Sequence, residues 1–142
     1  MRLGITAVIG IVACALAFAQ VTRSPAEAGA TAYFINLGDG DKVQSPVLVQ
    51  VGLSGMGVAP AGAQFDNTGH FHVLIDVDES ALDLNAPLPA NENIIHFGKG
   101  QTETQLELPP GEHTLQLLMG DFSHIPHEPV VASERITVTV GE

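Results

Sequence analysis

Short apolar runs separated by turn residues recur along the chain from residue 32 onward. The runs are rich in β-branched residues and are bounded by Gly, Pro, Asn and Asp, a pattern typical of antiparallel strands joined by turns. No stretch has a helical period of useful length. The predicted strands cover residues 32–37, 46–53, 70–77, 93–97, 102–108, 112–119 and 133–140. This pattern predicts an all-β chain that folds as an immunoglobulin-like antiparallel β-sandwich of about seven strands over residues 32–142.

The N-terminus has the pattern of a secretory signal peptide. Arg2 precedes an uncharged apolar run over residues 3–18, and the triplet Ala17-Phe18-Ala19 offers a peptidase site before Gln20. A second small-x-small triplet, Ala26-Glu27-Ala28, offers another site further along. Either cut leaves a chain without a membrane segment.

The N-terminal segment has two alternative interpretations, a retained membrane anchor and a lipoprotein signal. A retained transmembrane anchor needs roughly 20 apolar residues, and the run over residues 3–18 is shorter. Residues 11–14 fit a loose lipobox ending at Cys14, but the apolar run continues past the cysteine, which argues against lipoprotein anchoring. We therefore predict a signal peptide at 1–19, a flexible lead-in at 20–31, and a periplasmic domain that does not touch the membrane after cleavage.

The composition is acidic, which limits the possible partners. The chain has 16 Asp and Glu against 5 Lys and Arg, a net charge of −11. Nucleic acids and anionic membrane surfaces both need basic patches, so neither is an expected partner. The single cysteine, Cys14, leaves with the signal peptide, and the mature domain therefore has neither a disulfide nor a thiolate ligand.

Six histidines form the strongest candidate for chemistry. His70 and His72 are two positions apart at the start of a predicted strand, where the alternate positions Phe71, Val73 and Ile75 are apolar. The period of a strand places the two imidazoles on the face opposite the core, and we expect this face to be open to a ligand. Their Cβ atoms are on the order of 7 Å apart, so both rings can reach one metal ion.

The remaining histidines divide between the two ends of the sandwich. Because successive antiparallel strands alternate in direction, His96, His124 and His127 are expected at the same end as His70 and His72. His113 lies at the opposite end, where immunoglobulin-like domains often place a tyrosine that bonds to the corner backbone. We assign His113 that structural role.

Five converging imidazoles without thiolate suit Cu(II), Zn or Ni, and the Irving-Williams order favours copper, with zinc as second choice. Met56 or Met119 would help to hold Cu(I). The prediction is a periplasmic protein that binds copper for storage, delivery or tolerance and that exchanges it with a periplasmic metal-handling protein. The predicted metal-site residues are His70, His72, His96, His124 and His127, with His96 either a ligand or a residue that orients one.

The sequence leaves two other kinds of function open, and the enzymatic one applies only if a bound metal keeps a free coordination position. The same end of the domain could bind a protein or glycan of the cell envelope without catalysis, with histidines that are incidental or that sense pH near their usual pKa. No catalytic residues are predicted and the chain is not expected to be an enzyme, because no serine stands in a recognisable nucleophile context. The nearest match, Gly52-Leu53-Ser54-Gly55-Met56, lacks the closing glycine.

Four ordered segments resemble domain-of-unknown-function family 4399, a group of small exported bacterial proteins. They read TGHFHVLID, HFGKGQTET, LELPPGEHTLQLLMGD and HIPHEP, and the resemblance covers roughly residues 32–140. Members usually have a glycine followed by three histidines where this chain has Gly69-His70-Phe71-His72. The resemblance implies a bacterial periplasmic β-sandwich protein and supplies no activity, so the function has to be argued from the site.

Overall fold

Residues 21–142 are described by the structure, a computed structural model. The predicted signal peptide at 1–19 lies outside the described residues. Among residues 21–142, no helix is long and apolar enough to cross a membrane.

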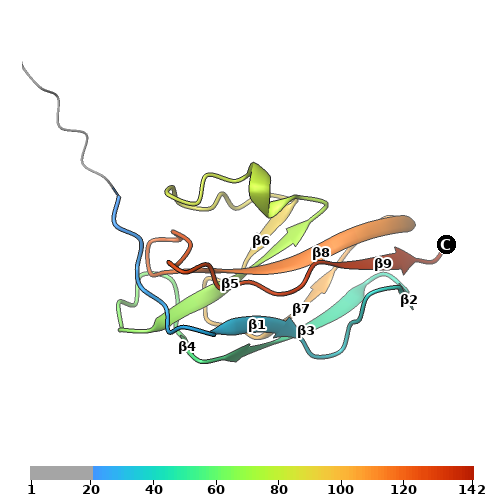
Figure 1. Cartoon of the computed structure of the whole chain (residues 1–142). Coiled ribbons are helices and arrows are strands. Elements are labelled where there is room, and N and C mark those ends of the chain that lie inside the picture. Colours follow the sequence, from blue (N-terminus) through green and yellow to red (C-terminus); the bar gives the residue numbers. More distant parts are fainter. Residues whose placement is uncertain (1–20) are drawn as a thin grey trace, which may run out of the picture.

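Two β-sheets make up the domain (Figure 1). The smaller sheet contains, in spatial order, β1 (Thr31–Phe34), β3 (Val47–Ser54) and β7 (Glu103–Leu106). The larger sheet contains β2 (Asp41–Val43), β9 (Ile136–Val140), β8 (Gly111–Gly120), β5 (Thr68–Ile75) and β4 (Gly57–Val58), with β6 (Ile94–His96) also paired to β5. The predicted fold class, an all-β sandwich, is confirmed.

The main core lies between the two sheets and follows the alternation of the strands. Val47, Val49 and Val51 of β3 are buried, whereas the intervening positions are not. They pack in one cluster with Phe71 and Val73 from the facing sheet. Burial of this apolar surface is the main driving force for closing the sandwich.

Each of the seven predicted strands is present, with ends that differ by a few residues. The short strands β2 and β4 were not predicted, and they run parallel to β9 and β5 respectively. Strands of two or three residues are too short to show an alternating pattern, so periodicity could not predict them.

The outer face of the larger sheet carries a second, smaller core. Leu74 of β5 and Leu118 of β8 are buried there against Leu88 and Ile94. The covering segment, residues 78–93, includes the short 3₁₀ helix η1 (Glu79–Ala81) and lies over the sheet (Figure 1). The prediction that this face of β5 is open was wrong, because every residue of β5 after Thr68 is buried.

The corner at residues 109–113 is held by His113, as predicted. Its Nε2 lies 2.9 Å from the Pro109 carbonyl oxygen, and its Nδ1 lies 2.7 Å from Oδ2 of Asp76. The hydrogen bond with Asp76 raises the pKa of His113 above its usual value. This histidine therefore ties β8 to the end of β5, far from the metal-binding chemistry expected of the others.

The N-terminal segment is attached to the domain. Residues 20–31 were expected to be a flexible lead-in, but Ala26 N–H donates to the Glu128 carbonyl (3.2 Å) and Glu128 N–H donates to the Ser24 carbonyl (3.0 Å). Figure 1 shows this segment running along the loop that follows β8. Small polar residues predict disorder only when no backbone partner is within reach, and here the loop supplies one.

Candidate metal centre

Four imidazoles converge at one end of the larger sheet. His70 and His72 come from β5, on the face opposite Phe71. His96 of β6 is the direct cross-strand partner of His72, so the two side chains stand on the same face. His124 comes from the loop after β8.

The four rings form a compact group, which we call the histidine cluster (His70, His72, His96 and His124). The ring centroid of His70 lies 4.9 Å from those of His72 and His96 and 5.0 Å from that of His124. His96 and His124 are 4.6 Å apart, and the widest separation, between His72 and His124, is 6.1 Å. The four rings thus surround one point in space.

The nitrogen positions fit a shared metal ion. One ring nitrogen from each of His70, His96 and His124 lies within 4.8 Å of the other two. The Nε2 atoms of His70 and His96 are 3.1 Å apart. Two nitrogens bound at about 2.0–2.1 Å to one tetrahedral ion stand roughly 3.3 Å apart, so this pair needs little movement to share a metal.

His72 is one of the two fully buried members of the cluster. Its side chain is fully buried, and among the described residues neither of its ring nitrogens has a hydrogen-bond partner. Nδ1 of His70 is also buried without a partner in residues 21–142. A buried, unsatisfied polar atom costs about 1–3 kcal/mol, so these nitrogens need an explanation. His72 does not belong to the group of three whose ring nitrogens lie within 4.8 Å of one another.

The environment lowers the pKa of three of the four imidazoles. Burial, together with the charges that His96 and His124 would carry, lowers the pKa of His70 to about 4. Burial and the neighbouring His70 and His96 lower the pKa of His72 to about 3. Burial and then His124 also lower the pKa of His96. Neutral imidazole is the form that binds metal, so the unprotonated lone pairs are available at neutral pH.

Two glycines make room for the rings. A Cβ atom on Gly120 would lie 2.7 Å from Cε1 of His72, and a Cβ atom on Gly98 would collide with the ring of His96. Neither glycine has a positive φ angle, so backbone conformation does not require glycine at either position. Glycine is required because the rings of His96 and His72 occupy the space that a Cβ atom would need.

We expect Gly98→Ala to weaken metal binding at least tenfold while the fold is kept. The added methyl group would push the partly exposed ring of His96 out of the cluster. Gly38→Ala is the matched control, since its Cβ would meet only ordinary contacts, 3.7 Å or more away. Titration with Cu(II) measures both affinities, and equal affinity in the two variants would contradict this role of Gly98.

His124 has a strained backbone that the surrounding loop supports. Its φ angle is 69°, in the left-handed region that disfavours a residue with a Cβ by about 1–2 kcal/mol. His124 N–H donates to the Asp121 carbonyl (2.8 Å), and Leu88 N–H donates to the His124 carbonyl (2.8 Å). Strain of this kind is common where a side chain is held for function.

His127 lies beside the cluster and is held by a different partner. It is 1% exposed, and its Nε2 lies 3.1 Å from the Thr68 carbonyl oxygen. Its ring packs against Gly69, where a Cβ would lie 2.7 Å from Cε1 of His127. The structure therefore brings together four of the five predicted ligands and places the fifth next to them.

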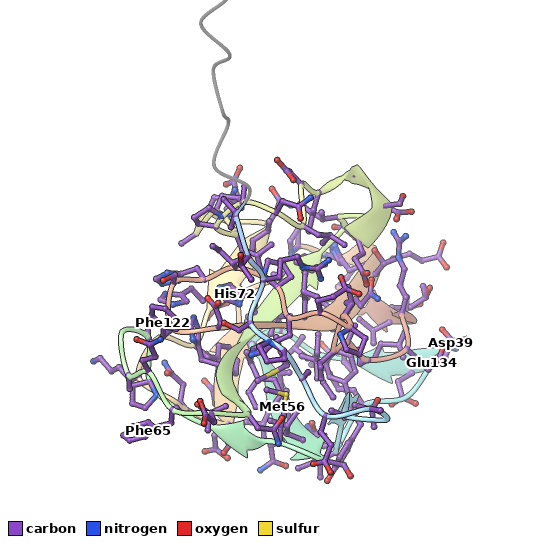
Figure 2. The ribbon with its side chains drawn as sticks, turned by 60° about the vertical axis from the view of Figure 1, so that its left-hand side comes forward. Asp39, Met56, Phe65, His72, Phe122 and Glu134 are labelled. Atoms are coloured by element: carbon purple, nitrogen blue, oxygen red, sulfur yellow. The ribbon has the colours of Figure 1, made fainter. Side chains whose placement is uncertain are left out.

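Neither predicted methionine reaches the cluster. Met119 pairs with Phe71 and belongs with it to the core between the sheets, on the opposite face of the sheet from His70 and His72. Met56 packs against that same core and lies apart from His72 (Figure 2). The expected help of a thioether in holding Cu(I) is therefore not available in this arrangement.

Three supporting residues were not foreseen from the sequence. No sequence pattern linked Gly98, Gly120 or Asp121 to the histidines. The signal that could have found them is position, because Gly98 is two residues after His96 and Gly120-Asp121 precedes His124.

A comparison with protein families gives one match. A family model described as "Domain of unknown function (DUF4399)" matches residues 49–141, which contain the whole histidine cluster. No curated protein and no solved structure matches the chain.

Proposed function

The chain belongs to the DUF4399 family, and from the geometry of its site we propose that it is an exported metal-binding protein that holds one copper ion in the histidine cluster. His70, His96 and His124 would each give one nitrogen to the ion, and His72 would give the fourth. Its role would be storage, delivery or tolerance of copper in the periplasm.

The observation that carries this proposal is the pair of buried, neutral histidines with unsatisfied nitrogens. An apolar residue at either position would avoid the cost of burying imidazole. His70 and His72 instead stand fully buried next to two further imidazoles, with one nitrogen pair 3.1 Å apart. Each ring can give one nitrogen to a bound ion, so an ion in the cluster would use imidazole lone pairs that are otherwise shielded from water.

Copper is favoured over zinc by the donor set. The cluster offers only imidazole, and among divalent ions copper has the highest affinity for such a site. Zinc also binds imidazole in tetrahedral sites and is the second choice. A direct competition between the two ions would rank them, and tighter binding of zinc would overturn the assignment of copper.

The partial exposure of two ligands supports exchange of the ion. His96 and His124 are half-buried, whereas His70 and His72 are inaccessible. An ion in the cluster would therefore be approached from the side of His96 and His124. This suits a protein that receives or gives up its metal through contact with a metal-handling partner.

The interaction module that senses pH is less well supported. That hypothesis needs histidines that titrate between about pH 5 and 7.5. The pKa values of His70 and His72 lie at about 4 and 3 because both are buried, so they stay neutral across that range.

Copper should stabilise the folded protein. An ion that binds only the folded chain at 100 times its dissociation constant adds about 2.7 kcal/mol, which corresponds to roughly 10 °C in the unfolding midpoint of a domain of this size. The measurement is thermal unfolding of the purified chain without Cu(II) and with free Cu(II) at 100 times the dissociation constant. A chelator should reverse the increase. An unchanged midpoint, with no copper retained after gel filtration, would contradict the proposal.

A further inference from the structure

The segment of residues 23–28, which we call the N-terminal strap, is fastened to the loop that carries His124. Arg23 Nε–H donates to the Pro126 carbonyl (2.9 Å), and the same guanidinium bonds to the His127 carbonyl and to the Glu128 carboxylate. The Arg23 side chain is largely covered, with 12% of it exposed. One side chain thus holds three consecutive residues of the loop.

The strap also contacts Asp121, whose side chain holds the turn around His124. The Ser24 hydroxyl donates to Oδ2 of Asp121 (2.6 Å). Oδ1 of the same carboxylate accepts hydrogen bonds from Ser123 N–H (2.8 Å) and Ile125 N–H (3.1 Å), the residues on either side of His124. Asp121 is 3% exposed, so it depends on these protein donors in place of water.

These contacts link the strap to the metal centre through one chain of bonds. Ser24 fixes one oxygen of Asp121, and the other oxygen fixes the backbone around His124. Because His124 has a left-handed φ of 69°, its turn relies on such external bonds. Burial lowers the pKa of His70, and the Asp121 carboxylate acts in the opposite direction.

We propose that Arg23 and Ser24 are positioning residues of the metal centre and that the mature protein keeps the strap. Of the two small-x-small triplets, only the one that ends at Ala19 leaves Arg23 and Ser24 in place. A cut after Ala28 would remove both donors and release the loop. This inference rests on the proposed metal binding for the role of Ser24, whereas retention of the strap can be tested without metal.

Intact mass spectrometry of the protein recovered from the periplasm after expression of the full chain tests retention. We expect a chain that begins at Gln20. A chain that begins at Gly29 would overturn the proposal. An uncleaved chain would contradict the predicted signal peptide but would still retain the strap.

The role of Ser24 is tested with the pair Ser24→Ala and Ser24→Thr. We expect Ser24→Ala to weaken Cu(II) binding threefold to tenfold and to change the electron paramagnetic resonance spectrum of the bound copper, because His124 is displaced. Ser24→Thr keeps a hydroxyl and should restore both. A merely structural role would lower the unfolding temperature and leave the spectrum unchanged, and that result would overturn the assignment.

Measurements on the parent protein distinguish failure of the positioning role of Ser24 from failure of the proposed metal binding. If the parent protein binds no copper, the metal centre itself is wrong, while the mass measurement still decides whether the strap is kept. If the parent binds copper and Ser24→Ala matches it in affinity and spectrum, only the positioning role is wrong.

Discussion

Replacing His70 and His72 together by alanine is expected to weaken Cu(II) binding at least 100-fold. The two residues are the fully buried members of the histidine cluster, so their loss leaves only the half-buried His96 and His124. Removing a group that merely orients a ligand commonly costs 10–100-fold in metal affinity, and two direct ligands should cost more. Titration against a competing chelator of known affinity measures the change.

Two further variants show whether weaker copper binding in the double variant results from loss of the ligands or from unfolding. His127→Ala removes another buried imidazole, but its Nε2 is bonded to the Thr68 carbonyl and its ring is outside the cluster, so we expect copper affinity within about threefold of the parent. His96→Ala changes a partly exposed residue of a three-residue strand and should weaken binding without unfolding the chain. If the double variant bound copper as tightly as His127→Ala, the proposed site would be wrong.

The metal-free protein should lose stability steeply as the pH falls from 6.5 to 5. Histidine in the unfolded chain has a pKa near 6.5, whereas burial lowers the pKa of His70 to about 4 and of His72 to about 3. The unfolded state therefore binds more protons below pH 6.5. Stability is complete above that pH and falls by about 4 kcal/mol at pH 5 if the two groups titrate independently.

The chosen pH window isolates the cluster from the corner at His113. The hydrogen bond with Asp76 raises the pKa of His113, so the contribution of that histidine is complete below pH 6.5 and is lost only as the pH rises through the raised value. Burial opposes ionisation of Asp76, but hydrogen bonds from His113 and Thr114 lower its pKa below the usual 3.8. The contributions of His113 and Asp76 to the free energy of unfolding therefore stay constant between pH 5 and 6.5.

His72→Leu is the matched variant for this measurement. The leucine has a similar size and leaves no nitrogen without a partner, so the metal-free variant should be about 1–3 kcal/mol more stable than the parent at pH 7.5. Averaged between pH 6.5 and 5, the proton uptake on unfolding should be about 1.6 in the parent and about 0.8 in the variant. Urea unfolding across this range measures both quantities, and an unfolding free energy that is flat with pH in the parent would contradict the burial of a neutral cluster.

Much of the fold could be predicted from the sequence because the main core follows strand periodicity. The valines of β3 and the alternate positions Phe71 and Val73 of β5 gave a clear two-residue pattern, and both proved to face the core between the sheets. The same pattern placed His70 and His72 together on the other face. Local alternation fixes which side chains share a face, and that part of the prediction was reliable.

Periodicity could not show what covers the second face. Residues 78–93 contain no regular strand, yet Leu88 packs on Leu74 and Leu118 and closes the outer face of the sheet. The contact joins positions far apart in the sequence, and no local pattern encodes it. For this reason the sequence indicated exposed histidines where the structure has buried ones.

The sequence predicted that the four imidazoles converge, but it did not predict the residues that hold them in place. Alternating strand directions bring His96 and His124 to His70 and His72, which requires only topology. The space provided by Gly98 and Gly120, and the bonds from Ser24 to Asp121, depend on atomic distances that a one-dimensional pattern does not contain.

Anomalous diffraction from crystals grown with one equivalent of Cu(II) would locate the copper ion that we propose for the histidine cluster. The expected result is a single copper peak about 2.0–2.1 Å from ring nitrogens of His70, His96 and His124, with His72 as the remaining ligand. A copper peak bound elsewhere on the chain, with His70 and His72 still lacking a partner, would contradict the account.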